Sequence, residues 1–223
     1  MTLDAGFKSR LQHAADYLEL SLNSDQNDKL LLYVEQLARW NRTYNLTAIR
    51  DTDQMLVQHI FDSLAVVPLV ISLLDKNTAS DFTIVDVGSG GGLPGVVLAI
   101  AAPWKVHCVD AVQKKMAFVR QMSGKLHLPN LQAHHARVET LDPFYADVVI
   151  SRAFSSLADF ARLAGHHVAD GGHLLAMKGR QPDDEIAALE ADRVWKVESI
   201  ETLSVPELDA HRCVLRLSRQ GKP

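Results

Sequence analysis

One aspartate and a cluster of glycines give this chain its clearest chemical signal. The stretch 83–95 reads TIVDVGSGGGLPG, in which an apolar run contains Asp86 and meets glycines at 88, 90, 91, 92 and 95. An apolar helical stretch follows at 96–101. A strand, a glycine turn and a helix in this order bring backbone N–H groups to the carboxyl end of a parallel sheet. The sequence therefore predicts that the functional site is built around this turn.

Two cofactor classes compete for this motif. Gly90 to Gly95 formally fits G-x-G-x-x-G, and Asp110 follows Gly90 by 20 residues, as in nicotinamide-binding folds. Asp86, however, lies inside the strand two residues before Gly88 and gives D-x-G-x-G, a pattern typical of methyltransferases. The turn then begins at Gly88, so the nicotinamide motif comes too late in the loop. We therefore favour S-adenosylmethionine as the cofactor.

The residue types suit that cofactor. The glycines let the backbone approach its methionine portion closely, and Asp110 can accept hydrogen bonds from ribose hydroxyls. Asp86 is expected to orient the loop or, through water, the amino-acid end. Glu139, after the third strand, lies where the adenine edge is usually read. The alternatives are a helix-capping role for Asp110 and an exposed loop position for Glu139.

The first 80 residues read as helical. Ser24 is predicted to cap a helix over 25–40 with an apolar stripe, and a second helical pattern covers 54–73 and breaks at Pro68. The polar and aromatic stretch 40–47 is predicted to be a loop that folds over the cofactor pocket.

From residue 82 short apolar strands alternate with helices, which predicts an α/β fold with a mostly parallel sheet. The helices are expected at 94–101, 112–127, 157–168 and 183–193. The last two strands lack an intervening helix and should pair as an antiparallel hairpin through 206–209, which matches a seven-stranded methyltransferase sheet. We divide the chain into a helical extension, 1–80, and a catalytic domain, 81–223, within one compact unit. The strands are expected at 83–87, 105–110, 131–136, 146–151, 172–178, 195–204 and 211–218.

Composition narrows the function classes. The 223 residues are 47% apolar and carry a net charge of −4, which argues against bulk nucleic-acid affinity. Residues 101–180 nevertheless hold ten Lys and Arg against six Asp and Glu, so a modest basic face near the glycine loop competes with an ordinary solvated surface. We expect no membrane span and no signal peptide, and we expect Cys108 and Cys213 to be buried and reduced, all of which favours the cytoplasm.

Taken together, the motifs resemble one family over nearly the whole chain, the small-subunit ribosomal RNA methyltransferase G family (RsmG, also called GidB). The combination of the glycine loop with NLT, H-x-x-D-S-L and SRA is highly specific. The family-like stretches are WNRTYNLTAIRD at 40–51, HIFDSL at 59–64, VDVGSGGGLPG at 85–95, FVRQM at 118–122, ARVE at 136–139, ISRAF at 150–154 and MKG at 177–179.

The resemblance implies a class I, Rossmann-like enzyme that transfers a methyl group from S-adenosylmethionine to N7 of a guanine (position 527) in the 530 loop of 16S rRNA. It also implies a substrate within the 30S subunit or an assembly intermediate. The residues expected at the cofactor are Asp86, Gly88, Gly90, Leu93, Asp110, Val138, Glu139 and Arg152.

Guanine N7 carries a free lone pair, so no general base is expected and catalysis would depend on alignment. Arg152 and Asn45 are candidates near the guanine, with a structural salt bridge from Arg152 to Asp147 or Asp86, and a turn-stabilising asparagine, as the alternatives. His59 and Asp62, three residues apart, are interpreted as a pair that braces the helical cap. The candidates for RNA phosphate contacts are Arg120, Arg137 and Lys178.

The adjacent histidine pairs 134–135 and 166–167 do not predict a metal site, because neighbouring side chains on a strand or helix diverge. Three other function classes stay open on the residues alone. They are a nicotinamide-dependent oxidoreductase, a non-enzymatic RNA-binding or ribosome-assembly protein with a vestigial cofactor fold, and a small-molecule methyltransferase.

Overall fold

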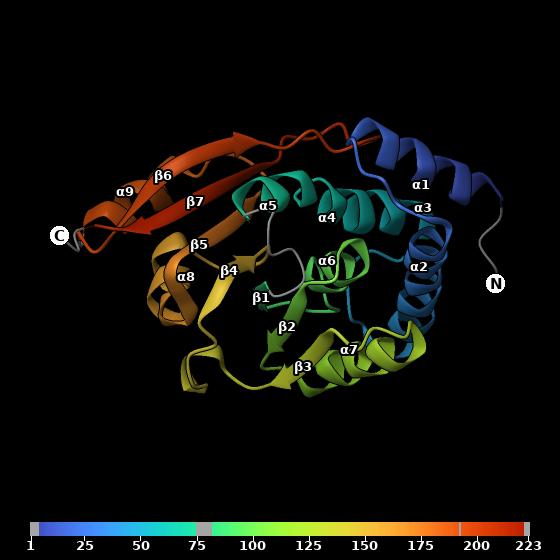
Figure 1. Cartoon of the computed structure of the whole chain (residues 1–223), viewed down its shortest axis with the longest axis horizontal. Coiled ribbons are helices and arrows are strands. Elements are labelled where there is room, and N and C mark those ends of the chain that lie inside the picture. The colour runs from blue at the N-terminus through green and yellow to red at the C-terminus, as the bar shows by residue number, and fades with distance from the viewer. Residues whose placement is uncertain (1–4, 75–81, 192, 221–223) are drawn as a thin grey trace.

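The protein is built around one seven-stranded sheet. The computed structural model describes residues 5–74, 82–191 and 193–220. The strand order is β3-β2-β1-β4-β5-β7-β6, and only β7 runs against the others (Figure 1). This confirms the predicted α/β class with an antiparallel last strand and the predicted pairing of the last two strands. The strands are β1 (Thr83–Val87), β2 (Lys105–Asp110), β3 (Leu131–His135), β4 (Ala146–Ser151), β5 (Val168–Lys178), β6 (Trp195–Thr202) and β7 (Cys213–Arg219).

Helices cover both faces of the sheet. On one face α6 (Gly95–Ala101) and α7 (Gln113–Lys125) pack on β2 and β3, and the N-terminal helices pack outside them. On the other face α8 (Leu157–Ala164) packs on β5, and α9 (Asp183–Ala191) packs on β6 (Figure 1). The connection from β3 to β4 holds no α-helix and only the short 3-10 turn η3 (Val138–Thr140).

The helical N-terminal region begins with α1 (Ala5–Tyr17) and α2 (Ser24–Tyr44). The predicted cap at Ser24 is wrong by one residue. Asn23 has extended backbone angles and accepts a hydrogen bond from Gln26 N at 2.9 Å, while Gln26 accepts one from Asn23 N at 2.9 Å. This reciprocal arrangement is a capping box, which places Ser24 inside the helix.

The predicted loop at 40–47 is also too long, because α2 continues to Tyr44. The rings of Trp40 and Tyr44 lie 4.9 Å apart, and Trp40 also contacts Phe118 of α7. The helix ends at Asn45, whose φ of 49° is the left-handed conformation that asparagine tolerates.

The predicted second helix is a chain of shorter pieces. They are α3 (Thr52–Met55), the π-helix η1 (Leu56–Phe61), α4 (Asp62–Leu64) and α5 (Val67–Leu73). The break precedes Pro68, which lies in the first turn of α5, where a missing N–H costs no helical hydrogen bond. Within the described residues, Thr52–Leu73 is long and apolar enough to span a membrane, but 67% of its most apolar window is buried inside the protein. Its apolarity is therefore explained by core packing.

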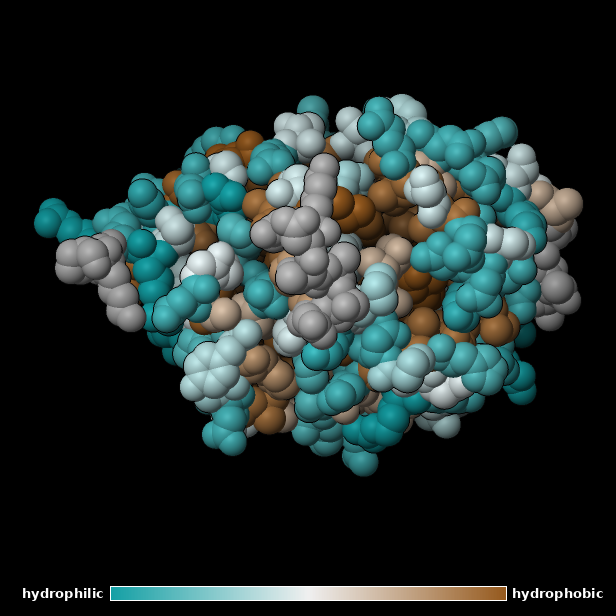
Figure 2. Space-filling model, viewed as in Figure 1, coloured by the Kyte–Doolittle hydropathy of each residue, from teal (hydrophilic) through white to brown (hydrophobic). Residues whose placement is uncertain are grey.

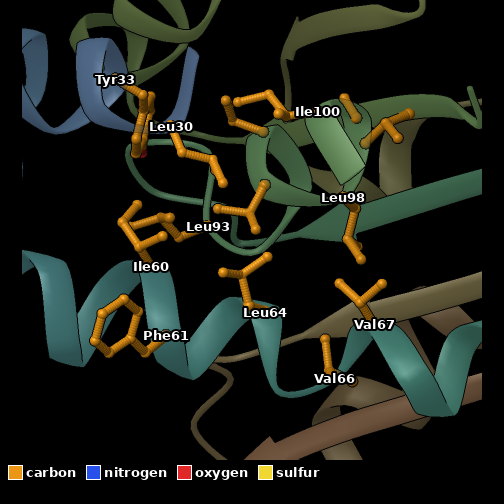
Figure 3. Packing of buried hydrophobic residues seen from close by; sticks show 14 of the residues in the cluster. Leu30, Tyr33, Ile60, Phe61, Leu64, Val66, Val67, Leu93, Leu98 and Ile100 are labelled. Atoms are coloured by element: carbon orange, nitrogen blue, oxygen red, sulfur yellow. The ribbon is translucent and has the colours of Figure 1, made fainter. Parts of the chain in front are cut away.

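Figure 3 shows that packing. Side chains of η1, α4 and α5 such as Ile60, Leu64 and Val67 face Leu30 of α2 and Leu98 of α6 across a single core. A second core lies under α8 and α9. On the face shown in Figure 2, hydrophilic residues predominate, with hydrophobic residues visible in the recesses between them. The division between 1–80 and 81–223 stays a prediction, and its boundary falls next to residues outside the described ranges.

The predicted helix 157–168 ends early. The α-helix stops at Ala164, a 3-10 turn η4 covers Gly165–His167, and β5 begins at Val168. A Cβ at Gly165 would lie 2.3 Å from the indole of Trp195, so only glycine allows that contact. The tighter turn also brings the rings of His166 and His167 to 3.9 Å, so the expectation that this pair diverges is wrong. No cluster of three metal-ligating side chains forms among the described residues.

The cap assignment predicts a simple contrast. Asn23→Ala removes the acceptor for Gln26 N and should lower the free energy of unfolding by about 1 kcal/mol. Ser24→Ala, one residue along and exposed, should change it by less than about 0.5 kcal/mol. Urea denaturation of the three proteins measures both values, and a larger loss for the Ser24 variant would contradict the assignment.

Candidate functional site

The glycine loop between β1 and α6 is held from three sides. Asp86 in β1 accepts a hydrogen bond from Gly95 N at 2.7 Å, and Asp110 at the end of β2 accepts one from Gly90 N at 3.0 Å. The hydroxyl of Tyr33 in α2 donates to Gly91 O at 2.8 Å. Each hydrogen bond comes from a different element, so the path of the loop is fixed by the sheet and by the helical region together.

Two loop glycines border open space. Gly88 and Gly90 have φ of +67° and +59°, which non-glycine residues rarely adopt, and a Cβ at either position would meet no atom within 4 Å. Gly95 has the opposite role, because a Cβ there would lie 2.5 Å from the sulfur of Cys108 and 2.9 Å from Asp86. The first two glycines leave room for a ligand, and the third lets α6 pack on the sheet.

The space beside Gly88 is a cavity of about 250 Å³, here named the sheet-edge cavity. It brings together four of the eight predicted cofactor residues, Gly88, Asp110, Val138 and Glu139, from three successive strand ends. Its walls combine apolar side chains with two carboxylates, a set that suits a flat heteroaromatic ring and hydroxyl donors. The lining residues are Val87, Gly88, Val109, Asp110, Ala111, Ala136, Arg137, Val138, Glu139, Phe154 and Leu163.

Asp110 is both a loop anchor and a cavity residue. Its Oδ1 accepts a hydrogen bond from Val112 N at 2.8 Å. Its Oδ2, which accepts from Gly90 N, also lies 3.4 Å from Lys115 Nζ. The carboxylate oxygens each have more than one lone pair, so they can still accept from a ligand hydroxyl. Val112 is itself the N-cap residue of α7, and no side chain makes a capping hydrogen bond to this helix, so the helix-capping alternative for Asp110 is wrong.

The segment that carries Val138 and Glu139 is fixed by a buried histidine. His167 lies 2.9 Å from Val138 O through Nε2, and its Nδ1 accepts a hydrogen bond from Phe144 N at 3.3 Å. Burial lowers the pKa of His167, which favours the neutral ring that this pattern of one donor and one acceptor requires. Val138 is buried, whereas Glu139 is exposed at the cavity, as its alternative of an exposed position expected.

The carboxyl group of Asp86, in β1 beneath the glycine loop, has a strongly raised pKa. It is fully buried, and burial raises its pKa to about 7 against the opposing effects of Gly95 N–H and of Arg152. Its Oδ1 has no hydrogen-bond partner among the described residues, and the same is true of Ser89 Oγ. Of the two predicted roles for Asp86, the structure supports the one in which it orients the loop.

A second cavity, of about 300 Å³ and here named the cap cavity, lies between the helical region and the carboxyl ends of the central strands. Its lining residues are Ile49, Gln58, His59, Asp62, Arg152, Met177, Lys178, Gly179, Leu203, Arg212 and Cys213. The segment after β4 separates the two cavities, since Arg152 lines the cap cavity and Phe154 lines the sheet-edge cavity.

Arg152 forms a salt bridge, but not to the predicted partners. Its guanidinium donates to Asp62 Oδ2 at 3.2 Å and to Gln58 O at 3.0 Å. Asp147 instead accepts a hydrogen bond from Thr83 N. Asp62 and His59 were interpreted as partners of each other, and the structure shows both of them at Arg152.

Three other predicted residues lie away from both cavities. Asn45 caps the end of α2 and is exposed. The Leu93 side chain packs into the core beside η1 (Figure 3), so only the backbone of Leu93 contributes to the surface of the glycine loop. Arg120 is exposed on α7 and donates to Ala133 O at 3.3 Å.

The two remaining candidates for RNA contacts differ in exposure and in how closely other side chains hold them. The side chain of Arg137 is 74% exposed at the rim of the sheet-edge cavity. Lys178 is largely buried, and its ammonium donates to both carboxylate oxygens of Glu185 at 3.0 and 2.8 Å. Arg137 makes only a long ion pair with Glu139, at 3.8 Å, and its exposure leaves it accessible for phosphate contact, whereas Lys178 is held closely by Glu185.

Sequence reasoning missed Tyr33, His167 and Arg212. The role of Tyr33 could have been predicted from the sequence, because its hydroxyl lies among the apolar stripe residues of a helix and needs a buried hydrogen-bond partner. Arg212, which donates to Asp62 Oδ1 at 2.8 Å across 150 residues, had no such sequence signal.

The raised pKa of Asp86 predicts a pH dependence of stability. The folded-state pKa of about 7 exceeds that of an unfolded aspartate, so the native state binds this proton more tightly. Raising the pH from about 4 to above 7 should therefore lower the free energy of unfolding, by an amount on the order of a few kcal/mol. Asp86→Asn should lose this component, which denaturation at pH 5 and pH 8 measures. An equal pH slope in both proteins would contradict the assignment.

Comparisons with known proteins agree with this geometry. A family model described as rRNA small subunit methyltransferase G matches residues 26–215. The chain is 60% identical over 219 residues to the ribosomal RNA small subunit methyltransferase G of Bordetella pertussis, covering 97% of this chain and 95% of that protein. It is 50% identical to the protein of the same name from Ralstonia nicotianae, covering 96% of each.

Among solved structures, magnesium protoporphyrin IX methyltransferase from Synechocystis PCC 6803 aligns with a TM-score of 0.55 at 15% identity, covering 89% of this chain and all of that one. This likeness shows a shared fold. The match of the family model and the identity to full-length relatives show more. The chain belongs to the rRNA small subunit methyltransferase G family.

Proposed function

We propose that this protein transfers a methyl group from S-adenosylmethionine to N7 of a guanine, position 527 in the 530 loop of 16S rRNA. The observation that carries the proposal is the pair of cavities on either side of the segment after β4. One contains the groups that suit the cofactor, and the other is a separate chamber for an acceptor. Family membership favours this reading over the nicotinamide alternative.

The residues of the sheet-edge cavity fit S-adenosylmethionine. Asp110 would accept hydrogen bonds from the ribose hydroxyls, and Val138 with Glu139 would contact the adenine. Gly88 and Gly90 leave the space that a side chain would otherwise fill. When bound, the cofactor supplies a methyl group made electrophilic by its sulfonium sulfur.

The acceptor needs no general base, because guanine N7 has a free lone pair. The only histidine lining the cap cavity within the described residues is His59, and burial together with Arg152 lowers its pKa to about 4. A neutral ring is appropriate here, since methyl transfer places positive charge on the purine and a cationic ring would oppose it. The protein would act by positioning the base and excluding water.

We further propose that the substrate is structured RNA in the 30S subunit or an assembly intermediate and that the protein acts in the cytoplasm. A chain with a net charge of −4 gains little from general attraction to RNA, so recognition should depend on a folded target. Exposed Arg137 and Arg120 are the candidates for phosphate contacts.

The direct test is a methyl-transfer assay. Purified protein, tritium-labelled S-adenosylmethionine and 30S particles from a strain without the family enzyme should give label in 7-methylguanosine at the 530 loop. Cofactor binding without transfer would favour a vestigial RNA-binding protein. Transfer to the isolated stem-loop at the same rate as to 30S particles would reject the structured-substrate proposal.

A second experiment tests the cofactor site. Gly88→Ala forces a Cβ onto a residue at φ +67° beside the cavity, so it should weaken S-adenosylmethionine binding at least about tenfold. Gly124→Ala is the matched control, because Gly124 lies in α7 without a positive φ and its added Cβ also meets open space. Isothermal titration calorimetry measures both variants, and equal affinities would place the cofactor elsewhere.

A further inference from the structure

A buried carboxylate with two guanidinium partners forms the wall of the cap cavity. The side chain of Asp62 is only 4% exposed, and its two oxygens accept hydrogen bonds from Arg152 and Arg212. Arg152 follows β4 and Arg212 lies between β6 and β7, so one aspartate joins the helical region to two separate parts of the sheet domain. A buried charge is tolerated only when it is paired in this way.

The carboxylate lies just after the π-helix η1. Within this segment the backbone oxygen of Gln58 and the ring of His59 both contact the guanidinium of Arg152, and Asp62 completes the contact one turn later. π-Helical turns are rare and occur frequently at functional sites. Three groups from η1 and the first residue of α4 thus hold a single cation.

The tautomer of His59 follows from its neighbours. Arg152 has only N–H donors, so Nδ1 of His59, 3.4 Å from Arg152 Nη2, accepts. Nε2 must then carry the proton and donates to Thr47 Oγ1 at 2.9 Å. Gln58 O lies 3.2 Å from Nδ1 but accepts only from Arg152 Nη1, because an unprotonated Nδ1 has no hydrogen to donate. The ring is therefore a neutral bridge between the loop after α2 and Arg152.

These contacts use three of the five N–H groups of Arg152, whose side chain is 23% exposed at the cavity. The remaining donors suit a carbonyl oxygen. Guanine presents such an oxygen, O6, on the same edge as N7, whereas adenine presents an amino donor there. A donor to O6 would select guanine and leave the N7 lone pair free.

Charge compensation explains why the guanidinium needs Asp62. An uncompensated arginine beside the acceptor would oppose the positive charge that methyl transfer places on the purine. Pairing with Asp62, which is shared with Arg212, together with a neutral His59, reduces that penalty while keeping the hydrogen-bond donors in place.

We propose that Asp62 and His59 are positioning residues that hold Arg152 at the acceptor base, so that Arg152 reads guanine O6 and sets the preference for guanine. This inference rests on the proposed function and extends it to the residues that determine base specificity.

The test uses the full-length protein and 30S particles that carry either guanosine or 2-aminopurine at the target position, since 2-aminopurine keeps N7 but lacks O6. Wild-type protein should prefer guanosine by about 10- to 100-fold in kcat/KM. His59→Leu should lower kcat/KM for guanosine at least about tenfold and reduce this preference, with the affinity for S-adenosylmethionine changed by less than about twofold. His59→Asn keeps an acceptor for Arg152 and should restore much of both values.

Asp62→Asn should have a larger effect in the same direction, but it leaves two guanidinium groups uncompensated and risks misfolding. The matched control is Asp53→Asn, the same change on the same helical segment in an exposed ion pair with Arg10, which should match wild type. If His59→Leu keeps the wild-type rate and preference, the positioning role is wrong. If wild-type protein methylates guanosine and 2-aminopurine equally, O6 recognition is wrong. Absence of methylation by wild-type protein would reject the proposed function itself.

Discussion

The hydrogen bonds that hold the glycine loop are the constraint on which the rest of the site depends. Asp86 fixes the start of α6, Asp110 fixes the middle of the turn, and Tyr33 ties the same turn to α2. Within the turn, Gly92 N and Leu93 N donate to Ser89 O, and the hydrogen bonds from neighbouring elements complete its shape. Placing a carboxyl group directly under the turn costs free energy, because burial disfavours the charged carboxylate. The same effect raises the pKa of Asp86.

The helical region is therefore part of the site and not only a cover for the sheet. It contributes Tyr33 to the loop, and it contributes His59 and Asp62 to the wall of the cap cavity. It also shares one hydrophobic core with α6, as Figure 3 shows. Displacing these helices would disturb the turn and the cap cavity together.

Much of the fold was predictable from the sequence. Short apolar runs alternating with helical patterns predicted the seven strands, and the missing helix between the last two predicted the antiparallel last strand, because these signals are local. The strand ends also placed Gly88, Asp110, Val138 and Glu139 at one edge, which the sheet-edge cavity confirms as a common location. Their contact with the cofactor stays a prediction.

The errors have physical causes of two kinds. The observed helix boundaries differ from the predicted ones where a neighbouring residue ends or caps the helix instead. Asn23 rather than Ser24 caps α2, and α8 ends at Gly165, which packs against Trp195. Partners were missed where the chain separation is large, since Arg152 and Arg212 reach Asp62 across 90 and 150 residues. No local pattern encodes such contacts, and the π-helix that supports them depends equally on tertiary packing.

The measurement that tests the account most directly is a crystal structure of the protein with S-adenosylmethionine bound. The account predicts density for the adenosine portion in the sheet-edge cavity, with the ribose on Asp110 and the methyl group directed past the segment after β4 toward Arg152 in the cap cavity. A cofactor bound in the cap cavity, or one whose methyl group is directed away from Arg152, would contradict it.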